Sequence, residues 1–189
     1  SGLPKETAGI HLPSMFSGSE GTLGVVTAAR LRLVPWYRAT AAALVACDSV
    51  DDALTLLDEL RVLPSLDAAE LLMPSALSVA CDHLGVSPPL DPSVVGPRGV
   101  FVMVDCAAHD DPAEGLAGVL ATRRGVMAIG PQRDLLYRIR DHVTIAIATL
   151  GTPVKLDVAL PLSRLAQFVG WLDDAVSTGA PRRCRVGRG

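Results

Sequence analysis

A glycine-rich stretch near the start of the chain has residue types and a spacing that suit phosphate binding. Residues 16–26 read Phe-Ser-Gly-Ser-Glu-Gly-Thr-Leu-Gly-Val-Val, with three glycines three residues apart. Glycine lets the main chain adopt positive φ and approach a ligand, and successive N–H groups can then hold phosphate oxygens. The spacing is not Gly-x-Gly-x-x-Gly and a strand is predicted to follow, which excludes the common nicotinamide-binding turn. A tight structural turn would explain the glycines equally well.

A second candidate group lies between residues 133 and 155. One side of the helix predicted there carries Arg133, Tyr137, Arg140, Thr144 and Ala148. An arginine and a threonine one turn apart could bind a carboxylate, because guanidinium offers two parallel donors and the hydroxyl a third. Lys155 would add a positive charge from a predicted strand. The pattern alone favours a simpler interpretation, in which these cations are solvated.

The glycine-rich stretch resembles a signature of one enzyme family. It is similar to the Phe-x-Gly-Ser-Glu-Gly-Thr-Leu-Gly-Val-x-Thr motif of FAD-linked oxidases of the vanillyl-alcohol oxidase type. The similar branch contains D-lactate dehydrogenase, glycolate oxidase and D-2-hydroxyglutarate dehydrogenase, in which this loop lines the flavin. Residues 5–12 also resemble the stretch that precedes the motif. The resemblance implies that FAD is bound by Gly18, Ser19, Glu20, Gly21, Thr22, Gly24 and Val25.

The second group resembles the same family. Residues 136–142 read Leu-Tyr-Arg-Ile-Arg-Asp-His, and residues 155–158 read Lys-Leu-Asp-Val before Pro161. They are similar to the family's Arg-Glu-x-Ile/Val helix and its Lys-Tyr/His-Asp strand. The resemblance implies that Arg140, Thr144 and Lys155 bind the substrate carboxylate and that Asp157 positions Lys155. It assigns no residue of this chain as the catalytic base.

The resemblance predicts a fragment of an FAD-dependent oxidoreductase that oxidises a small 2-hydroxy acid by hydride transfer to FAD. Residues 1–36 would form the C-terminal edge of the FAD-binding domain, and residues 37–189 an incomplete substrate domain, or cap. This fragment alone is expected to be inactive. Two alternatives remain at this stage: a non-catalytic α+β module that binds a ligand or regulates, and an inactive remnant.

Metal ligands are not predicted in this chain. The family carries a segment with metal-binding histidines near the position of the present C-terminus, and in an alignment with it Arg185 would replace the first histidine and Arg188 an aspartate. None of the four histidines lies at ligand spacing from another; they are His11, His83, His109 and His142. A divalent metal in the complete enzyme is therefore doubtful from the sequence.

Alternating strands and helices must position these residues. Strands are predicted at residues 22–34, 41–47, 68–72, 100–106, 126–129 and 154–160. Helices are predicted after Ser49, from Pro74, after Pro112, from about Gln132 and after Ser163. This order predicts an α+β fold, with a mixed or antiparallel sheet covered by helices. The resemblance implies the ferredoxin-like cap of FAD-linked oxidases.

Composition excludes some partners. The net charge is −3, so the chain lacks the basic surface of a nucleic-acid-binding protein. Four scattered cysteines fit buried thiols in a reducing compartment, which predicts a cytoplasmic location. Membrane association stays open, because some members of the family pass electrons to membrane quinones. The expected partner is the 2-hydroxy acid; the electron acceptor is unassigned, and a homo-oligomer is left open.

Overall fold

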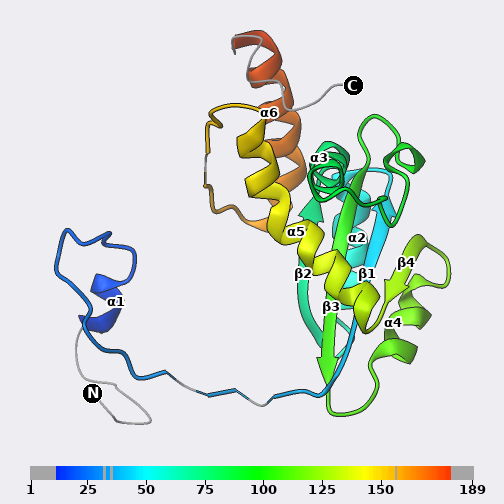
Figure 1. The fold of residues 1–189 in the computed structure, drawn as a ribbon, viewed down its shortest axis with the longest axis horizontal. Helices are drawn as coiled ribbons and strands as arrows, with labels where there is room; N and C mark the ends of the chain where they lie inside the picture. The colour runs from blue at the N-terminus through cyan, green and yellow to red at the C-terminus, as the bar shows by residue number, and fades with distance from the viewer. Residues whose placement is uncertain (1–11, 32, 35, 156, 180–189) are drawn as a thin grey trace. The chain divides into compact units, whose positions relative to one another are not determined.

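The computed structural model of the protein describes residues 12–179 apart from 32, 35 and 156 (Figure 1). Contacts within the chain divide it into two units, Ser1–Trp36 and Tyr37–Gly189. The first unit holds α1 (Leu12–Phe16) and the glycine-rich stretch. Residues 5–11, which resemble the family's preceding stretch, and the terminal arginines at 185 and 188 lie outside the described residues.

Four antiparallel strands form the sheet of the second unit, in the order β2-β3-β1-β4. The strands are β1 (Ala39–Cys47), β2 (Leu66–Leu72), β3 (Val100–Ala108) and β4 (Arg124–Ala128). The helices are α2 (Val50–Leu60), α3 (Pro74–Leu84), α4 (Ala113–Leu120), α5 (Pro131–Thr149) and α6 (Leu165–Gly179). With α2 between β1 and β2, and α4 between β3 and β4, the topology is ferredoxin-like. The α+β prediction with an antiparallel sheet is confirmed.

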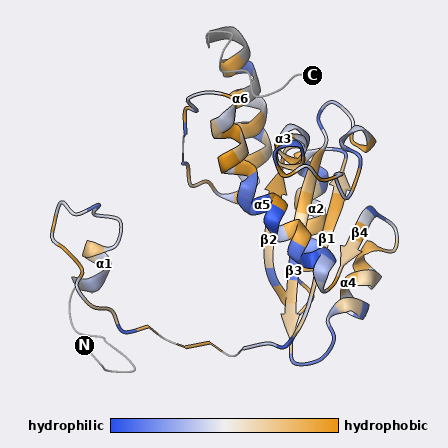
Figure 2. Cartoon of the chain, viewed as in Figure 1, coloured by the Kyte–Doolittle hydropathy of each residue, from blue (hydrophilic) through white to orange (hydrophobic). Residues whose placement is uncertain are grey.

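Helices cover both faces of this sheet, so residues 41–47 and 100–106 of its central strands are apolar at consecutive positions rather than at alternate ones, with Asp105 as the exception. One face packs against α2, α4 and α6 through Ala41, Ala43, Val45, Cys47, Val100, Val102, Val104 and Cys106. The other face packs against α3 and α5 through Ala42, Leu44, Ala46, Phe101 and Met103. Figure 2 shows β1 and β3 as an apolar centre and hydrophilic patches along α5.

Local signals set the helix ends as the sequence predicts. The Ser49 side chain accepts the Asp52 N–H at 3.1 Å, and the Asp52 carboxylate accepts the Asp48 N–H at 3.0 Å, so α2 begins with a reciprocal cap. Pro74 and Pro131 stand in the first turns of α3 and α5. These caps fix where the chain leaves one layer and enters the next.

Two predicted strands are wrong for this structure. The described residues of 22–34 and 154–160 have no regular secondary structure. Their apolar side chains are open to solvent: Leu33 is 91% exposed and Val154 is 73% exposed. A strand requires a neighbour for its main-chain hydrogen bonds, and no described strand of this chain pairs with either segment. The alternating pattern is therefore present without the partner that would make it a strand.

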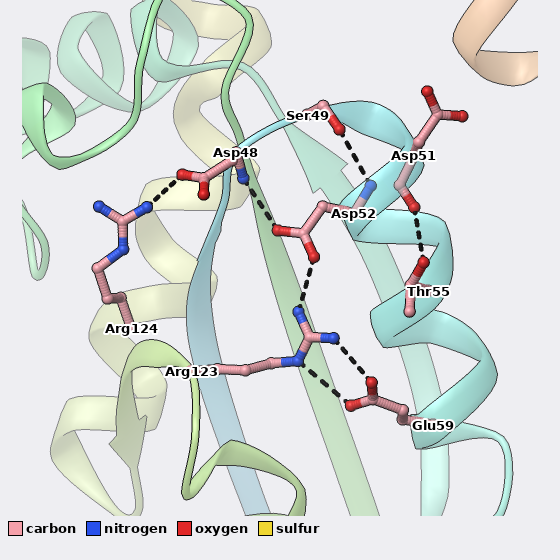
Figure 3. Close-up of polar contacts among 8 residues, drawn as sticks. All are labelled: Asp48, Ser49, Asp51, Asp52, Thr55, Glu59, Arg123 and Arg124. Atoms are coloured by element: carbon pink, nitrogen blue, oxygen red, sulfur yellow. Dashed lines mark hydrogen bonds and ion pairs between the residues drawn. The ribbon is translucent and has the colours of Figure 1, made fainter.

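A cluster of charged side chains fastens β4 to α2 (Figure 3). Arg123 donates from Nη1 to Asp52 at 3.0 Å, and from Nε and Nη2 to the two oxygens of Glu59 at 3.2 and 2.8 Å. Beside it, Arg124 donates from Nη2 to one oxygen of Asp48. The Arg123 side chain is 14% exposed, so its hydrogen bonds are better shielded from solvent than those of a surface pair. We call this group the Arg123 clamp.

The Arg123 clamp should make stability depend on acid pH. Burial opposes the charged form of Asp52, but the Asp48 N–H and Arg123 outweigh it and lower the Asp52 pKa; the hydrogen bonds from Arg123 lower the Glu59 pKa. Lowered pKa values add stability above the ordinary values of 3.8 and 4.5, and this stability is lost as pH falls through the folded-state values. We expect Arg123→Gln to lower the free energy of unfolding at about pH 6 and much less at about pH 3.

Urea unfolding of wild type and variant across this pH range checks the expectation. Arg61→Gln is the control, because Arg61 pairs with Asp58 at 3.4 Å on an exposed surface and should matter little at any pH. A difference between wild type and Arg123→Gln that stays constant with pH would show that the clamp does not act through these carboxylates.

Core packing gives a second expectation. Phe101 is fully buried on the face that α3 and α5 cover. Phe101→Ala should lower the free energy of unfolding by about 3–5 kcal/mol, because it removes buried apolar surface and leaves a cavity. Val62→Ala is the control, since Val62 is 81% exposed and the change should stay within about 0.5 kcal/mol. Chemical denaturation of both variants makes the comparison; equal effects would contradict the assigned core.

Candidate functional site

The glycine-rich stretch follows α1 as a loop built on left-handed residues. Gly18 has φ +78°, Glu20 +48° and Gly21 +82°. The Thr22 N–H and hydroxyl both donate to the Ser19 carbonyl, at 2.9 and 2.6 Å. Glycine is suited to positions 18 and 21, because side chains strongly disfavour this region of φ. The loop conformation therefore depends on the glycines that the sequence singled out.

The loop is also open. A Cβ atom added at Gly18 or Gly21 would meet nothing within 4 Å, whereas one at Gly24 would lie 3.0 Å from the Phe16 ring. Ser19 is half-buried, and Glu20, Thr22 and Val25 are exposed. Exposed main chain with left-handed turns can present N–H groups to an anion. The loop thus has the surface that a bound phosphate or flavin would need.

Arg140 is the best-defined of the predicted substrate residues. Its neighbours Leu136 and Ile139 are buried and hold α5 on the sheet. The Arg140 Nε donates to Glu70 at 2.8 Å, Nη2 donates to the other Glu70 oxygen, and Nη1 donates to Asp141 at 3.0 Å. These hydrogen bonds, above all those that Arg140 donates to Glu70, raise the pKa of the guanidinium. Arg140 is 41% exposed, so a ligand can still reach it.

A second ion pair lies beside the first. Arg133 donates from Nε and Nη2 to the two oxygens of Asp105, both at 3.1 Å. Asp105 is the buried charged residue of the described core. The Tyr137 ring lies 4.6 Å from the Arg133 guanidinium carbon and 6.0 Å from that of Arg140, which is within reach of a cation–π interaction. Burial, with a hydrogen bond to Asp105, raises the Tyr137 pKa to about 12.

The two ion pairs border a small cavity of about 70 Å³. The cavity is lined by Asp67, Ala68, Glu70, Met103, Asp105, Tyr137 and Arg140. The register explains why: Ala68 pairs with Asp105, and Glu70 pairs with Met103, so these four residues share the face toward α5. The cavity wall therefore includes both the Arg140 guanidinium and the Glu70 carboxylate that orients it.

The structure brings together some of the predicted residues and not others. Thr144 lies one turn after Arg140 on α5 and is exposed, as the helical spacing requires. Lys155 and Asp157 are exposed in the irregular segment after α5. In the part of the chain that the structure describes, no ion pair joins Lys155 to Asp157. A role for Asp157 in positioning Lys155 therefore stays a prediction.

Sequence reasoning missed Glu70 and Asp105 as members of the site. Asp105 is the charged residue of the otherwise apolar strand Val100–Ala108, and Glu70 is one of two acidic residues, with Asp67, in the strand Leu66–Leu72. A charged residue inside a buried apolar strand must find a partner. Its presence there is the sequence signal that could have identified it as a member of an ion pair. The partner could be named only once the register and the position of α5 were known.

The histidines and cysteines that the structure describes do not form a further centre. The His142 ring nitrogen Nδ1 contacts the Arg138 carbonyl at 2.7 Å, and the ring centroid lies 6.1 Å from that of His83. Among the described residues, no group of three or more His, Cys, Asp or Glu is placed to hold a metal. Cys47, Cys81 and Cys106 are buried free thiols, and burial raises the Cys47 pKa to about 11.

Comparisons with known proteins bear on these residues. No family model matches the chain. The mitochondrial D-2-hydroxyglutarate dehydrogenase of Rattus norvegicus is 30% identical over 179 residues, which cover 88% of this chain and 32% of that protein. The D-2-hydroxyglutarate dehydrogenase of Xanthomonas citri is 29% identical over 176 residues, 88% of this chain and 36% of that protein. A putative mitochondrial D-lactate dehydrogenase of Schizosaccharomyces pombe is 27% identical over 88% of this chain.

The predicted cytoplasmic location is wrong by this comparison. The relatives from Rattus norvegicus, Bos taurus and Schizosaccharomyces pombe are named mitochondrial. Free buried thiols indicate a reducing compartment but do not separate the cytoplasm from other reducing compartments.

As for membranes, none of the helices among the described residues has the length and apolar character to cross one.

The chain spans about a third of the length of the relatives it matches. It is similar to them over most of its own length, and both motif-bearing stretches of the sequence pointed to their branch. The comparisons therefore confirm the resemblance to the D-2-hydroxyglutarate dehydrogenase branch of the FAD-linked oxidases.

Proposed function

We propose that this chain is the substrate-side part of an FAD-dependent dehydrogenase that oxidises a small 2-hydroxy acid. The observation that carries the proposal is its similarity to D-2-hydroxyglutarate dehydrogenases over 88% of the chain. D-2-hydroxyglutarate and D-lactate are the substrates we infer first, because they appear in the names of the relatives. The structure supports the proposal with an accessible arginine anchored on a rigid helix.

Each of the two units has a role in this proposal. Residues 1–36 would be the edge of the FAD-binding domain, and residues 37–189 part of the substrate domain. The division of contacts into Ser1–Trp36 and Tyr37–Gly189 supports this assignment. So does the ferredoxin-like sheet of the second unit, which is the architecture that the resemblance implies for the substrate domain.

The residues of the loop fit a flavin nucleotide. Positive φ at Gly18 and Gly21, with no atom near either missing Cβ, leaves the main chain free to lie against a phosphate. We propose that FAD is held by Gly18, Ser19, Glu20, Gly21, Thr22, Gly24 and Val25. Val25 is 84% exposed and can give apolar contact. When bound, FAD supplies the acceptor for the substrate hydride.

The substrate carboxylate is assigned to Arg140, Thr144 and Lys155. Arginine has five N–H donors, and Arg140 uses three of them on Glu70 and Asp141, so two stay available. Thr144 adds a hydroxyl one turn along α5. Lys155 would add a second positive charge for the substrate carboxylate. Binding the carboxylate would neutralise it and orient the C–H bond for transfer.

The ferredoxin-like topology by itself is compatible with the alternative of a non-catalytic binding module, since this fold hosts unrelated functions. Similarity to dehydrogenases over most of the chain favours the enzyme. An exposed loop that depends on left-handed glycines also favours it, because a module made of the second unit alone would not need that loop.

Arg140→Ala in the complete protein tests the substrate assignment. We expect kcat/KM for D-2-hydroxyglutarate or D-lactate to fall about a hundredfold or more, because a positioning contact to the carboxylate is lost. Arg138→Ala is the matched control, since Arg138 is an exposed arginine on the same helix outside the stripe. Steady-state kinetics with an artificial electron acceptor provide the measurement. Equal activity of the two variants would refute the role of Arg140.

Gly21→Val tests the cofactor assignment. A valine at φ +82° strains the loop and covers its main chain, so the purified complete protein should contain less FAD per chain. Gly118→Ala is the control, because Gly118 lies in α4 with open space where a Cβ would be and alanine favours helix. Flavin content from absorbance decides: full occupancy in Gly21→Val would contradict the assignment of the loop.

A further inference from the structure

We infer that Glu70 is a positioning residue for Arg140 and determines which edge of the guanidinium is offered to a substrate carboxylate. This inference rests on the proposed function, because it adds a residue to the site described there. Glu70 is not among the residues that the resemblance assigns to substrate binding. It enters through the geometry of the ion pair alone.

Glu70 occupies one edge of the Arg140 guanidinium and leaves the rest. Its two oxygens accept from Nε and from Nη2, and Asp141 accepts from Nη1. The N–H groups that remain are one on Nη1 and one on Nη2. The guanidinium is planar and its donors have fixed directions. When Glu70 holds the Nε–Nη2 edge, the remaining Nη2–H therefore points away from Glu70 on β2. A carboxylate can therefore bind Arg140 without displacing Glu70.

Both partners of this pair are held by rigid elements. Glu70 lies on β2 opposite Met103 of β3. Arg140 follows the buried Ile139 on α5 and has the Tyr137 ring 6.0 Å from its guanidinium carbon. A long arginine side chain has many rotamers, so an anchor on the sheet is what restricts Arg140 to one of them. Sites supported in this way keep their geometry better than sites on loops.

The charges around Arg140 allow an opposite role for Glu70. Glu70 and Asp141 place two negative charges against one guanidinium, and both would repel an incoming carboxylate. Glu70 could then act as a latch that blocks Arg140 until the ligand displaces it. The two roles predict opposite effects of removing the charge. If Glu70 positions Arg140, removing its charge weakens substrate binding. If Glu70 is a latch, removing its charge strengthens substrate binding. We infer positioning because Glu70 uses only the Nε–Nη2 edge, and with Asp141 also bound one donor remains on each terminal nitrogen.

Glu70→Gln in the complete protein separates the two roles. We expect KM for D-2-hydroxyglutarate to rise about tenfold, with a smaller change in kcat, because the guanidinium loses its preferred orientation. Glu59→Gln is the matched control, since Glu59 accepts from Nε and Nη2 of Arg123 in the same way on the other face of the sheet. An unchanged KM in Glu70→Gln, or a lowered one, overturns the inference.

A double variant shows whether Glu70 acts through Arg140. Glu70→Gln combined with Arg140→Ala should have the KM of Arg140→Ala alone; a further rise would overturn the inference.

If Glu70→Gln does not fold, Glu70→Asp keeps the charge with a shorter reach and should still raise KM, and an unchanged KM overturns the inference. If Arg140→Ala itself leaves KM unchanged, the proposed substrate site has failed. If only the Glu70 variants behave as wild type, the positioning role alone has failed.

Discussion

The pairing of β1 with β3 is the constraint on which the rest of the structure depends. The two strands pair over their full length, from Ala39 with Ala108 to Cys47 with Val100, and helices cover both of their faces. A charged residue buried in such a sheet needs a partner from a covering helix. Asp105, which is buried on β3, meets that requirement by pairing with Arg133 of α5, and Glu70 on the edge strand β2, which is 42% exposed, pairs with Arg140 of the same helix.

Among the described residues, three arginines hold a carboxylate through Nε and Nη2, but in different surroundings. The pairs of Arg123 with Glu59 and of Arg133 with Asp105 fasten secondary-structure elements together. Arg140 has the same geometry with Glu70 and a more exposed side chain than Arg123, which is 14% exposed. The difference in exposure, rather than the type of hydrogen bond, separates a structural arginine from one that can receive a ligand.

Much of the fold follows from local sequence patterns. The apolar runs of the strands, Ser49 before α2 and the proline that opens α3 each predicted an element where one is found. The segment at 154–160 shows the limit: its residues alternate as in a strand, but pairing needs a neighbour, and sequence alternation does not supply one. The same holds for residues 22–34.

The candidate site was predictable to the extent that helical spacing defines it. Arg140 and Thr144 share a side of α5 because they are four residues apart, and glycines at 18 and 21 anticipated left-handed φ. Glu70 was not predictable as a partner of Arg140, because that contact joins residues 70 positions apart and depends on the register of β2 on β3. Long-range ion pairs of this kind are set by tertiary packing.

The central claim is that this chain contributes to a flavin site that oxidises a 2-hydroxy acid. Anaerobic mixing of the complete protein with D-2-hydroxyglutarate or D-lactate, followed by the visible absorbance of the flavin, tests it most directly. The account predicts a protein that carries FAD and loses the absorbance of oxidised flavin with one of these acids. A protein that binds no flavin, or whose flavin stays oxidised with both, would contradict it.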